Sequence, residues 1–252
     1  MNKALVAVFV FLLSLQIATA TAQSLKVGVG LSKPPYIIQE NNSGVEYEIM
    51  SRALEIAGYR MVPKYMPLLR IPHELNGGGL DAGMHLRAHI SIDGFFSDEV
   101  ISYRNYAIAL EAEDLKLESL SDLKKVSVIA FQNAKKLLGE HFFEAVDGNK
   151  NYAEIANQEL QVRMLAAGRA QVAVADHRIF LHFKKVFETK NGKFLRFRFY
   201  PLFDPTPYRA AFRSRAVRDA FDEGLAELKR SGEYDRIISK YIAPDELIAV
   251  TQ

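Results

Sequence analysis

Glu74-Leu75-Asn76-Gly77-Gly78-Gly79-Leu80-Asp81-Ala82-Gly83-Met84 is the first copy of a pattern that returns as Met164-Leu165-Ala166-Ala167-Gly168-Arg169-Ala170-Gln171-Val172-Ala173-Val174-Ala175-Asp176. Each copy is a helical stretch followed by glycine and then by small, β-rich residues. Glycine just past a helix can adopt the left-handed backbone that ends it, and the run after it is typical of a strand. Two copies, each inside its own series of strands and helices, predict two similar α/β lobes with a ligand in the cleft between them.

The two predicted lobes share the chain unequally. Residues 23–111 form the first part of lobe 1, residues 112–198 form lobe 2, and residues 199–252 return to lobe 1 and add its C-terminal helices. The first crossing is placed at Glu113–Lys124, where the composition shifts to Glu, Asp, Lys and Ser, and the second at the proline-containing segment Pro201–Pro207.

Periodicity and turn residues outline the elements of both lobes. The predicted strands are Leu25–Gly30, Arg60–Tyr65, Leu80–Leu86, Tyr106–Glu111, Val126–Ala130, Gln171–Ala175 and Arg196–Tyr200. The predicted helices are Val45–Ala57, Ile71–Asn76, Asn133–Phe143, Leu160–Ala167, Ile179–Phe187, Ala216–Ser231 and Ile237–Tyr241.

The N-terminus has the pattern of a secretory signal peptide. Lys3 supplies the positive region, Ala4–Leu15 the apolar region, and Ala18–Ala22 two small-x-small cleavage sites. We expect cleavage after about Ala22 and a mature protein in the periplasm; an uncleaved anchor helix is the alternative. The chain has 0 Cys, which fits an exported protein without disulfides and excludes thiolate zinc sites and cysteine nucleophiles.

Composition and motifs narrow the class of function. The 252 residues are 49% hydrophobic and 25% charged, with 32 basic and 30 acidic side chains, which is the balance of an ordinary soluble protein. The basic residues between Lys184 and Arg198 are interrupted by Glu188, so no nucleic-acid partner is predicted. Gly77-Gly78-Gly79 lacks the Lys-Ser/Thr of a phosphate loop. We predict a monomeric binding protein that is not an enzyme and carries no cofactor.

Three residues are candidates for ligand contact from their own positions. Asp176 ends a strand at the carboxyl edge where open α/β sheets bind ligands, but it could instead cap the following helix. Arg87 could pair with a ligand carboxylate, or with Asp93 or Asp98. Tyr36 follows two prolines and is predicted to wall the cleft, with a core position as the alternative.

Three further polar residues are candidates: Lys33, Gln132 and Asn133. Lys33 is a loop lysine that could simply face solvent, but its position places it at the mouth of the cleft. Gln132 and Asn133 could present amide groups at a helix N-terminus, although Asn133 could equally serve only as the cap. His85 and His89 are spaced for a metal only if both lie on one helix, which the predicted strand-to-loop change there opposes, so no metal site is predicted.

Five motifs in order resemble a known family. They are Gly44-Val45-Glu46-Tyr47-Glu48-Ile49, Leu80-Asp81-Ala82, Phe96-Ser97-Asp98, Ala175-Asp176, and Leu228-Lys229-x-Ser231-Gly232-Glu233-Tyr234-Asp235-x-Ile237. Together they resemble the bacterial extracellular solute-binding proteins of family 3, the type 2 periplasmic binding proteins of amino-acid ABC importers, over about Leu25 to Ile242. The resemblance implies two lobes joined by two hinge crossings, closure over a small ligand in a central cleft, and an inner-membrane ABC permease or receptor as partner.

The ligand residues of that family match this chain poorly. Its acidic residue and aromatic in the first strand-to-helix loop correspond to Gly30 and Lys33, and its next pocket aromatic corresponds to Leu68. Asp176 matches the family aspartate that takes a ligand ammonium, and Arg87 is the only arginine in the loop where the family grips a carboxylate. We therefore expect weak or no binding of ordinary L-amino acids and preference for another small polar solute, including an anionic one.

Two other functions are compatible with the sequence. A sensory module for a membrane receptor would use the same closure as a transport protein. A dehydratase-like enzyme on the same scaffold would need a carboxylate in a dry pocket, for which only Asp176, Glu46 and Glu48 are available, and the two glutamates are expected to face solvent.

Overall fold

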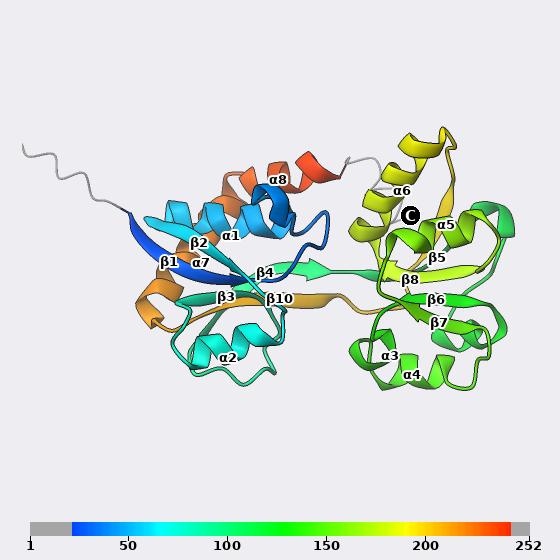
Figure 1. Cartoon of the computed structure of the whole chain (residues 1–252), viewed down its shortest axis with the longest axis horizontal. Coiled ribbons are helices and arrows are strands. Elements are labelled where there is room, and N and C mark those ends of the chain that lie inside the picture. Colours follow the sequence, from blue (N-terminus) through cyan, green and yellow to red (C-terminus); the bar gives the residue numbers. More distant parts are fainter. Residues whose placement is uncertain (1–21, 243–252) are drawn as a thin grey trace, which may run out of the picture.

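Two five-stranded sheets divide the chain into two lobes (Figure 1). The computed structural model describes residues 22–242, so the predicted signal peptide, apart from Ala22, lies outside the described residues. Sheet 1 has the order β2 (Tyr59–Tyr65), β1 (Gln23–Val29), β3 (Ala82–Leu86), β10 (Thr206–Phe212), β4 (Phe95–Tyr103). Sheet 2 has the order β7 (Tyr152–Ile155), β6 (Val128–Phe131), β8 (Val172–Asp176), β5 (Asn105–Leu110), β9 (Phe197–Tyr200).

The repeated sequence pattern corresponds to a repeated topology. In lobe 1, β1 pairs in parallel with β2 and β3, and in lobe 2, β6 pairs in parallel with β7 and β8. The first copy spans α2 (Arg70–Asn76) and β3, and the second spans α5 (Glu159–Ala166), Gly168 at φ 65° and β8. The predicted two-lobed α/β fold is therefore confirmed.

Helices cover both faces of each sheet (Figure 1). In lobe 1, α1 (Val45–Ile56), α7 (Arg215–Arg230) and α8 (Glu233–Tyr241) share one core with the sheet, while α2 covers a smaller core on the other face. In lobe 2, α5 and α6 (His177–Asn191) cover one face, and α3 (Ala134–Leu137) and α4 (Glu140–Val146) cover the other. Within residues 22–242, no helix combines the length and apolarity needed to cross a membrane.

The first crossing lies earlier than the sequence predicted. β4 belongs to sheet 1 and β5 to sheet 2, so the chain changes lobes at Arg104, and the predicted boundary after Glu111 falls inside lobe 2. The charged stretch that suggested the boundary is a surface loop containing the 3₁₀ turns 111–113 and 120–125. The chain returns between Tyr200 and Thr206, so residues 199 and 200 still belong to lobe 2.

Two other local predictions are corrected. The helix predicted over Asn133–Phe143 is two helices, because Gly139 adopts φ 88° between α3 and α4. The segment read as a loop after β3 contains β4, whose edge position and polar Ser97-Asp98-Glu99 obscured a strand pattern.

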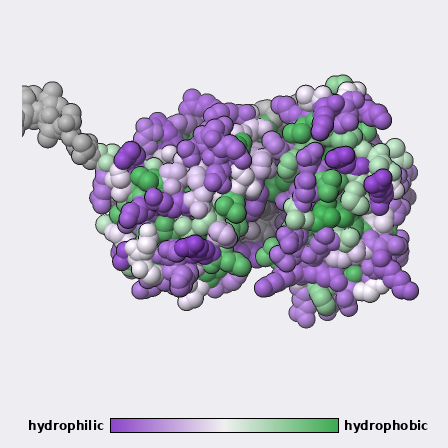
Figure 2. Space-filling view, viewed as in Figure 1, coloured by the Kyte–Doolittle hydropathy of each residue, from purple (hydrophilic) through white to green (hydrophobic). Residues whose placement is uncertain are grey.

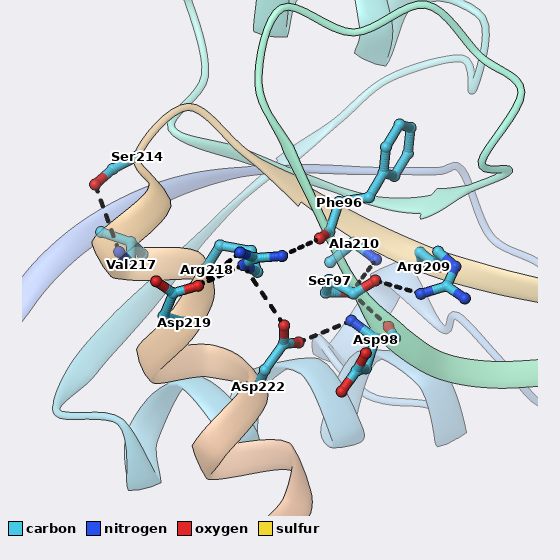
Figure 3. Close-up of polar contacts among 10 residues, drawn as sticks. All are labelled: Phe96, Ser97, Asp98, Arg209, Ala210, Ser214, Val217, Arg218, Asp219 and Asp222. Carbon is cyan, nitrogen blue, oxygen red and sulfur yellow. Dashed lines mark hydrogen bonds and ion pairs between the residues drawn. The ribbon is translucent and has the colours of Figure 1, made fainter.

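Hydrogen bonds of the Phe96-Ser97-Asp98 motif link β4 to α7 and β10 (Figure 3). Arg218 of α7 donates to the Phe96 carbonyl at 2.9 Å, and the Asp98 amide donates to Asp222 at 2.9 Å. The Ser97 hydroxyl accepts from the amide of Ala210 at 3.0 Å, where the β4–β10 pairing shifts register. The motif thus satisfies polar groups of the scaffold, on the strand that leads into the hinge.

Gly44 positions the first loop against α1. Its backbone, at φ 115° and ψ 156°, lies in a region that essentially only glycine adopts. A Cβ there would lie 2.4 Å from the Tyr36 carbonyl oxygen. That close approach lets the amides of Val45 and Glu46 donate to the carbonyls of Pro35 and Tyr36, so the loop supplies the partners for the start of α1.

Candidate functional site

A cavity of about 250 Å³ lies between the lobes, where Figure 2 shows a hollow. It is lined at the carboxyl ends of the parallel strands β1, β3, β6, β7 and β8, the edge where open α/β sheets bind ligands. Its lining residues in lobe 1 are Lys33, Arg87, Tyr103, Thr206 and Tyr208. Its lining residues in lobe 2 are Asn105, Phe131, Gln132, Leu137, Leu138, Ala156, Gln158, Asp176 and Ile179.

The structure brings four of the predicted site residues to this cavity: Lys33, Arg87, Gln132 and Asp176. They come from the loop after β1, the end of β3, the end of β6 and the end of β8. The cavity contains residues from both lobes, as a ligand that closes the cleft requires.

The other three predicted residues lie elsewhere. Tyr36 is buried behind the cavity wall, its ring stacked on Tyr103 with centroids 3.8 Å apart, so it does not wall the cleft. Leu68 packs above Gly30 and joins the small core under α2. Asn133 starts the short helix α3 in a left-handed conformation, and its amide donates to Glu154 at 2.7 Å.

Asp176 acts as the helix cap that the sequence offered as an alternative, and it also lines the cavity. Its Oδ1 accepts from the amides of Arg178 and Ile179, at 2.9 and 3.1 Å, at the start of α6. The same oxygen accepts from the Tyr36 hydroxyl of lobe 1 at 2.9 Å, and Oδ2 accepts from the Arg104 amide at the crossing, also at 2.9 Å. A ligand ammonium at this carboxylate would find Oδ1 fully occupied.

The ionisation of Asp176 follows from these contacts. Burial alone would raise the pKa of this carboxyl, which is 3% exposed. The His177 ring, 3.7 Å away, the Arg178 guanidinium and the Ile179 amide outweigh burial and lower the pKa below its ordinary value. The charge of Asp176 is therefore balanced inside the protein.

A second buried carboxylate supports the cavity from behind. Glu46, at the start of α1, is 1% exposed, which corrects the expectation that it faces solvent. Its side chain accepts from His85 Nδ1 at 2.9 Å and from the Tyr103 hydroxyl at 3.1 Å. His85 Nε2 lies 3.3 Å from Lys33 Nζ, so a chain of contacts runs from Glu46 through His85 to a lysine that lines the cavity.

This chain of contacts defines the protonation of His85. A ring that donates from Nδ1 to Glu46 and accepts at Nε2 from the Lys33 ammonium is neutral, with its proton on Nδ1. Burial lowers the pKa of His85, reinforced by the charges of Lys33 and Arg87 and opposed by Glu46. His85 also stacks on Tyr208 at 3.8 Å and has φ 61°, a left-handed backbone that is uncommon outside glycine.

Lys33 and Arg87 carry the positive charge of the cavity. Lys33 Nζ lies 5.5 Å from the centroid of the Tyr103 ring, and the Arg87 guanidinium lies 6.0 Å from that of Tyr208. Arg87 also reaches the Thr206 hydroxyl at 3.5 Å. Within residues 22–242 neither cation has an acidic side chain within 4.0 Å, so Arg87 does not pair with Asp93 or Asp98.

Burial sets the ionisation of Lys33. It lowers the pKa of the ammonium below its ordinary value, and the charges of Glu46 and Asp176 offset this in part. An anion in the cavity would stabilise the charged form further. Between residues 22 and 242 no group of three or more His, Cys, Asp or Glu side chains could hold a metal ion.

Five polar residues at the cavity or behind its wall were not predicted as ligand contacts: Glu46, His85, Tyr103, Asn105 and Tyr208. Glu46 was discounted because acidic residues are common in the first turn of a helix and usually face water. The signal in the sequence that could have indicated its burial is its position between the apolar residues Val45 and Tyr47. Both of these are buried in the structure. His85 stands at the end of a strand of otherwise small and apolar residues, a position that favours burial.

The sequence and the fold of this chain are similar to those of known binding proteins. The chain is 24% identical over 212 residues to a Neisseria gonorrhoeae protein named a probable histidine-binding protein, a match covering 81% of this chain and 76% of the relative. The GluR0 ligand-binding core in complex with L-glutamate superposes with a TM-score of 0.67 at 15% identity, over 88% of this chain and 100% of that one. No family model matches the chain.

A second solved structure agrees with the first. An ancestral arginine-binding protein bound to glutamine matches with a TM-score of 0.62 at 21% identity, covering 87% of this chain and 97% of that chain. At these identities the solved structures show the fold, and they confirm the two-lobed architecture of periplasmic binding proteins. The similarities also confirm the resemblance to amino-acid solute-binding proteins.

Replacing Asp176 tests its role as cap and interlobe contact. We expect Asp176→Ala to lower the free energy of unfolding by roughly 2–3 kcal/mol, because α6 loses its cap and the buried Tyr36 hydroxyl loses its acceptor. Asp176→Asn should cost clearly less, since its amide oxygen can still cap the helix. Urea unfolding of the ligand-free protein measures both. Equal free energies of unfolding for the alanine variant and the parent protein would show that the capping and interlobe contacts of Asp176 do not stabilise the fold.

The neutral state of His85 predicts a loss of stability in acid. The unfolded chain takes up a proton near the ordinary pKa of 6.5, whereas the folded state resists it, so the unfolded state binds more protons below that pH. The free energy of unfolding of the parent protein should therefore fall as pH falls below 6.5. Its slope with pH should exceed that of His85→Asn by up to about 1.4 kcal/mol per pH unit. Urea unfolding between pH 7 and 5 gives the slopes. Nitrogen-15 NMR at pH 6 should show the Nδ1–H form; a doubly protonated His85 ring there would refute the assignment.

Proposed function

We propose that this protein is an exported receptor that captures a small anionic solute between its lobes and presents it to an ABC importer of the inner membrane. The two-lobed fold, the relatives among amino-acid solute-binding proteins and the predicted signal peptide support this proposal. Its activity is reversible binding in the periplasm by a monomer, with no chemical step.

The observation that carries the proposal is the pair of cations on one wall of the cavity. Lys33 and Arg87 both line it from lobe 1, each beside a tyrosine ring. Hydrogen bonds from ammonium and guanidinium groups to a carboxylate are the stronger, charge-assisted kind, and partial burial weakens the competition from water. A carboxylate held between these side chains would supply the acidic partner that neither has among the described residues.

The relative named as histidine-binding raises the question of an amino acid, whose ammonium needs an acidic acceptor. Asp176 is committed to α6, Tyr36 and Arg104, and Glu46 is committed to His85 and Tyr103. At Asp176 Oδ1 and at Glu46 a ligand ammonium would have to displace buried hydrogen bonds, each costing about 1–3 kcal/mol when left unmade; only Asp176 Oδ2, with the Arg104 amide as its single donor, keeps an acceptor position. An anion without an ammonium avoids that cost.

Closure follows from the positions of the contacts. A ligand held by Lys33 and Arg87 of lobe 1 can reach the side-chain amides of Gln132 and Gln158 on lobe 2. Because a ligand that contacts both lobes binds the closed state more tightly than the open one, it shifts the population toward closure. The importer would then recognise the closed form.

Isothermal titration calorimetry with a panel of anions and L-amino acids tests the proposal. We expect an anion such as pyruvate, succinate or 3-phenylpropanoate to bind more tightly than any common L-amino acid. Lys33→Gln and Arg87→Gln should each weaken the best anion by about tenfold or more, the equivalent of a charged hydrogen bond.

Lys64→Gln is the matched control, because it removes an exposed lysine of lobe 1 that does not line the cavity. It should leave the affinity unchanged. Micromolar binding of a common L-amino acid that survives both Lys33→Gln and Arg87→Gln would overturn the proposal.

A further inference from the structure

The two walls of the cavity differ in chemistry. Every lobe 1 side chain that lines it ends in a charged or hydrogen-bonding group: Lys33, Arg87, Tyr103, Thr206 and Tyr208. The lobe 2 wall adds an apolar surface that lobe 1 lacks: five of its nine lining residues are apolar, namely Phe131, Leu137, Leu138, Ala156 and Ile179, and the other four are polar. A ligand that spans the cleft therefore meets two positive charges on lobe 1, and on lobe 2 it meets an apolar surface together with neutral amides.

A break in the helical backbone between α3 and α4 places apolar side chains of lobe 2 at the cavity. Helix α3 is a single turn that ends before Gly139, and this break leaves Leu137 and Leu138 at the cavity instead of continuing one amphipathic helix into the core. Leu138 and Phe131 pack partly against the lobe 2 core, whereas Leu137 remains 45% exposed. Apolar area of this kind gains free energy when a ligand removes it from water.

Among the described residues, the one charged side chain that lines the cavity from lobe 2 is Asp176, and most of its acceptor positions are filled: Oδ1 accepts three hydrogen bonds and Oδ2 accepts one. The polar lining residues of lobe 2 other than Asp176 are the neutral amides Asn105, Gln132 and Gln158. The end of the ligand that faces lobe 2 should accordingly be uncharged.

We infer that the ligand is a monocarboxylate with an aromatic or branched apolar tail and without an ammonium group. Its carboxylate lies between Lys33 and Arg87 on lobe 1, and its tail lies against Leu137, Leu138 and Phe131 on lobe 2. This inference rests on the proposed function and specifies its substrate class. The cavity of about 250 Å³ falls below the ~300–1,000 Å³ typical of drug-sized ligands, which suits a small metabolite with one ring or one branched chain.

Four probes that differ by one group each test the inference by calorimetry. They are 3-phenylpropanoate, L-phenylalanine with an added ammonium, 2-phenylethylamine without the carboxylate, and propanoate without the ring. We expect 3-phenylpropanoate to bind at least tenfold more tightly than L-phenylalanine and propanoate, and 2-phenylethylamine to show no binding. The heat-capacity change on binding should be more negative for 3-phenylpropanoate than for propanoate, because 3-phenylpropanoate buries more apolar surface.

Leu137→Ser isolates the apolar wall. This side chain is partly exposed and absent from the buried core, so the variant should fold. It should weaken 3-phenylpropanoate several-fold and leave propanoate unchanged. Phe143→Ser is the matched control, since Phe143 is 44% exposed on α4 and does not line the cavity, and it should change neither affinity.

The outcomes separate this inference from the proposed function. If propanoate binds as tightly as 3-phenylpropanoate and both depend on Lys33, the anion receptor stands and the apolar tail is wrong. If L-phenylalanine binds more tightly than 3-phenylpropanoate, independently of Lys33, both the substrate class and the proposed anion site are wrong. Failure of all four probes to bind the folded protein would also overturn the inference.

Discussion

The hydrogen bonds of the Asp176 carboxylate are the constraint on which the site depends. This side chain ends β8, caps α6, and accepts from Tyr36 of lobe 1 and from Arg104 at the crossing. From there Tyr36 stacks on Tyr103, whose hydroxyl reaches Glu46, and Glu46 holds the His85 ring beside Lys33. The ligand edge of lobe 2 is thereby joined, through a continuous set of buried contacts, to the cation that lines the cavity from lobe 1.

That arrangement separates the charges of the site into two groups. The two carboxylates nearest the cavity, Asp176 and Glu46, are buried and hold protein donors. The two cations, Lys33 and Arg87, face the cavity beside aromatic rings. A buried charge is tolerated when it is paired and hydrogen-bonded, as the carboxylates are. The cations are less satisfied, which is why the cavity is suited to a ligand that brings negative charge.

Much of the fold was readable from the sequence, because the helix–glycine–strand pattern is local and occurs at equivalent places in both sheets. Four residues predicted from the sequence line the proposed cavity, namely Lys33, Arg87, Gln132 and Asp176, and each lies at or shortly after the end of a parallel strand. Glu46 and His85 were missed because their burial arises from contacts between α1 and β3, which no local pattern reports. The first crossing was misplaced because one mainly apolar run, Val100–Leu110, contributes to both sheets, whereas the change in composition comes after it.

A crystal structure of the protein with 3-phenylpropanoate tests the central claim most directly. The account predicts the carboxylate within hydrogen-bonding distance of Lys33 Nζ and the Arg87 guanidinium, with the ring against Leu137 and Leu138 and the Asp176 contacts to α6 and Tyr36 unchanged. A carboxylate bound instead at the lobe 2 amides, with the ring against Tyr103 and Tyr208, would contradict it. So would a ligand that displaces Tyr36 from Asp176.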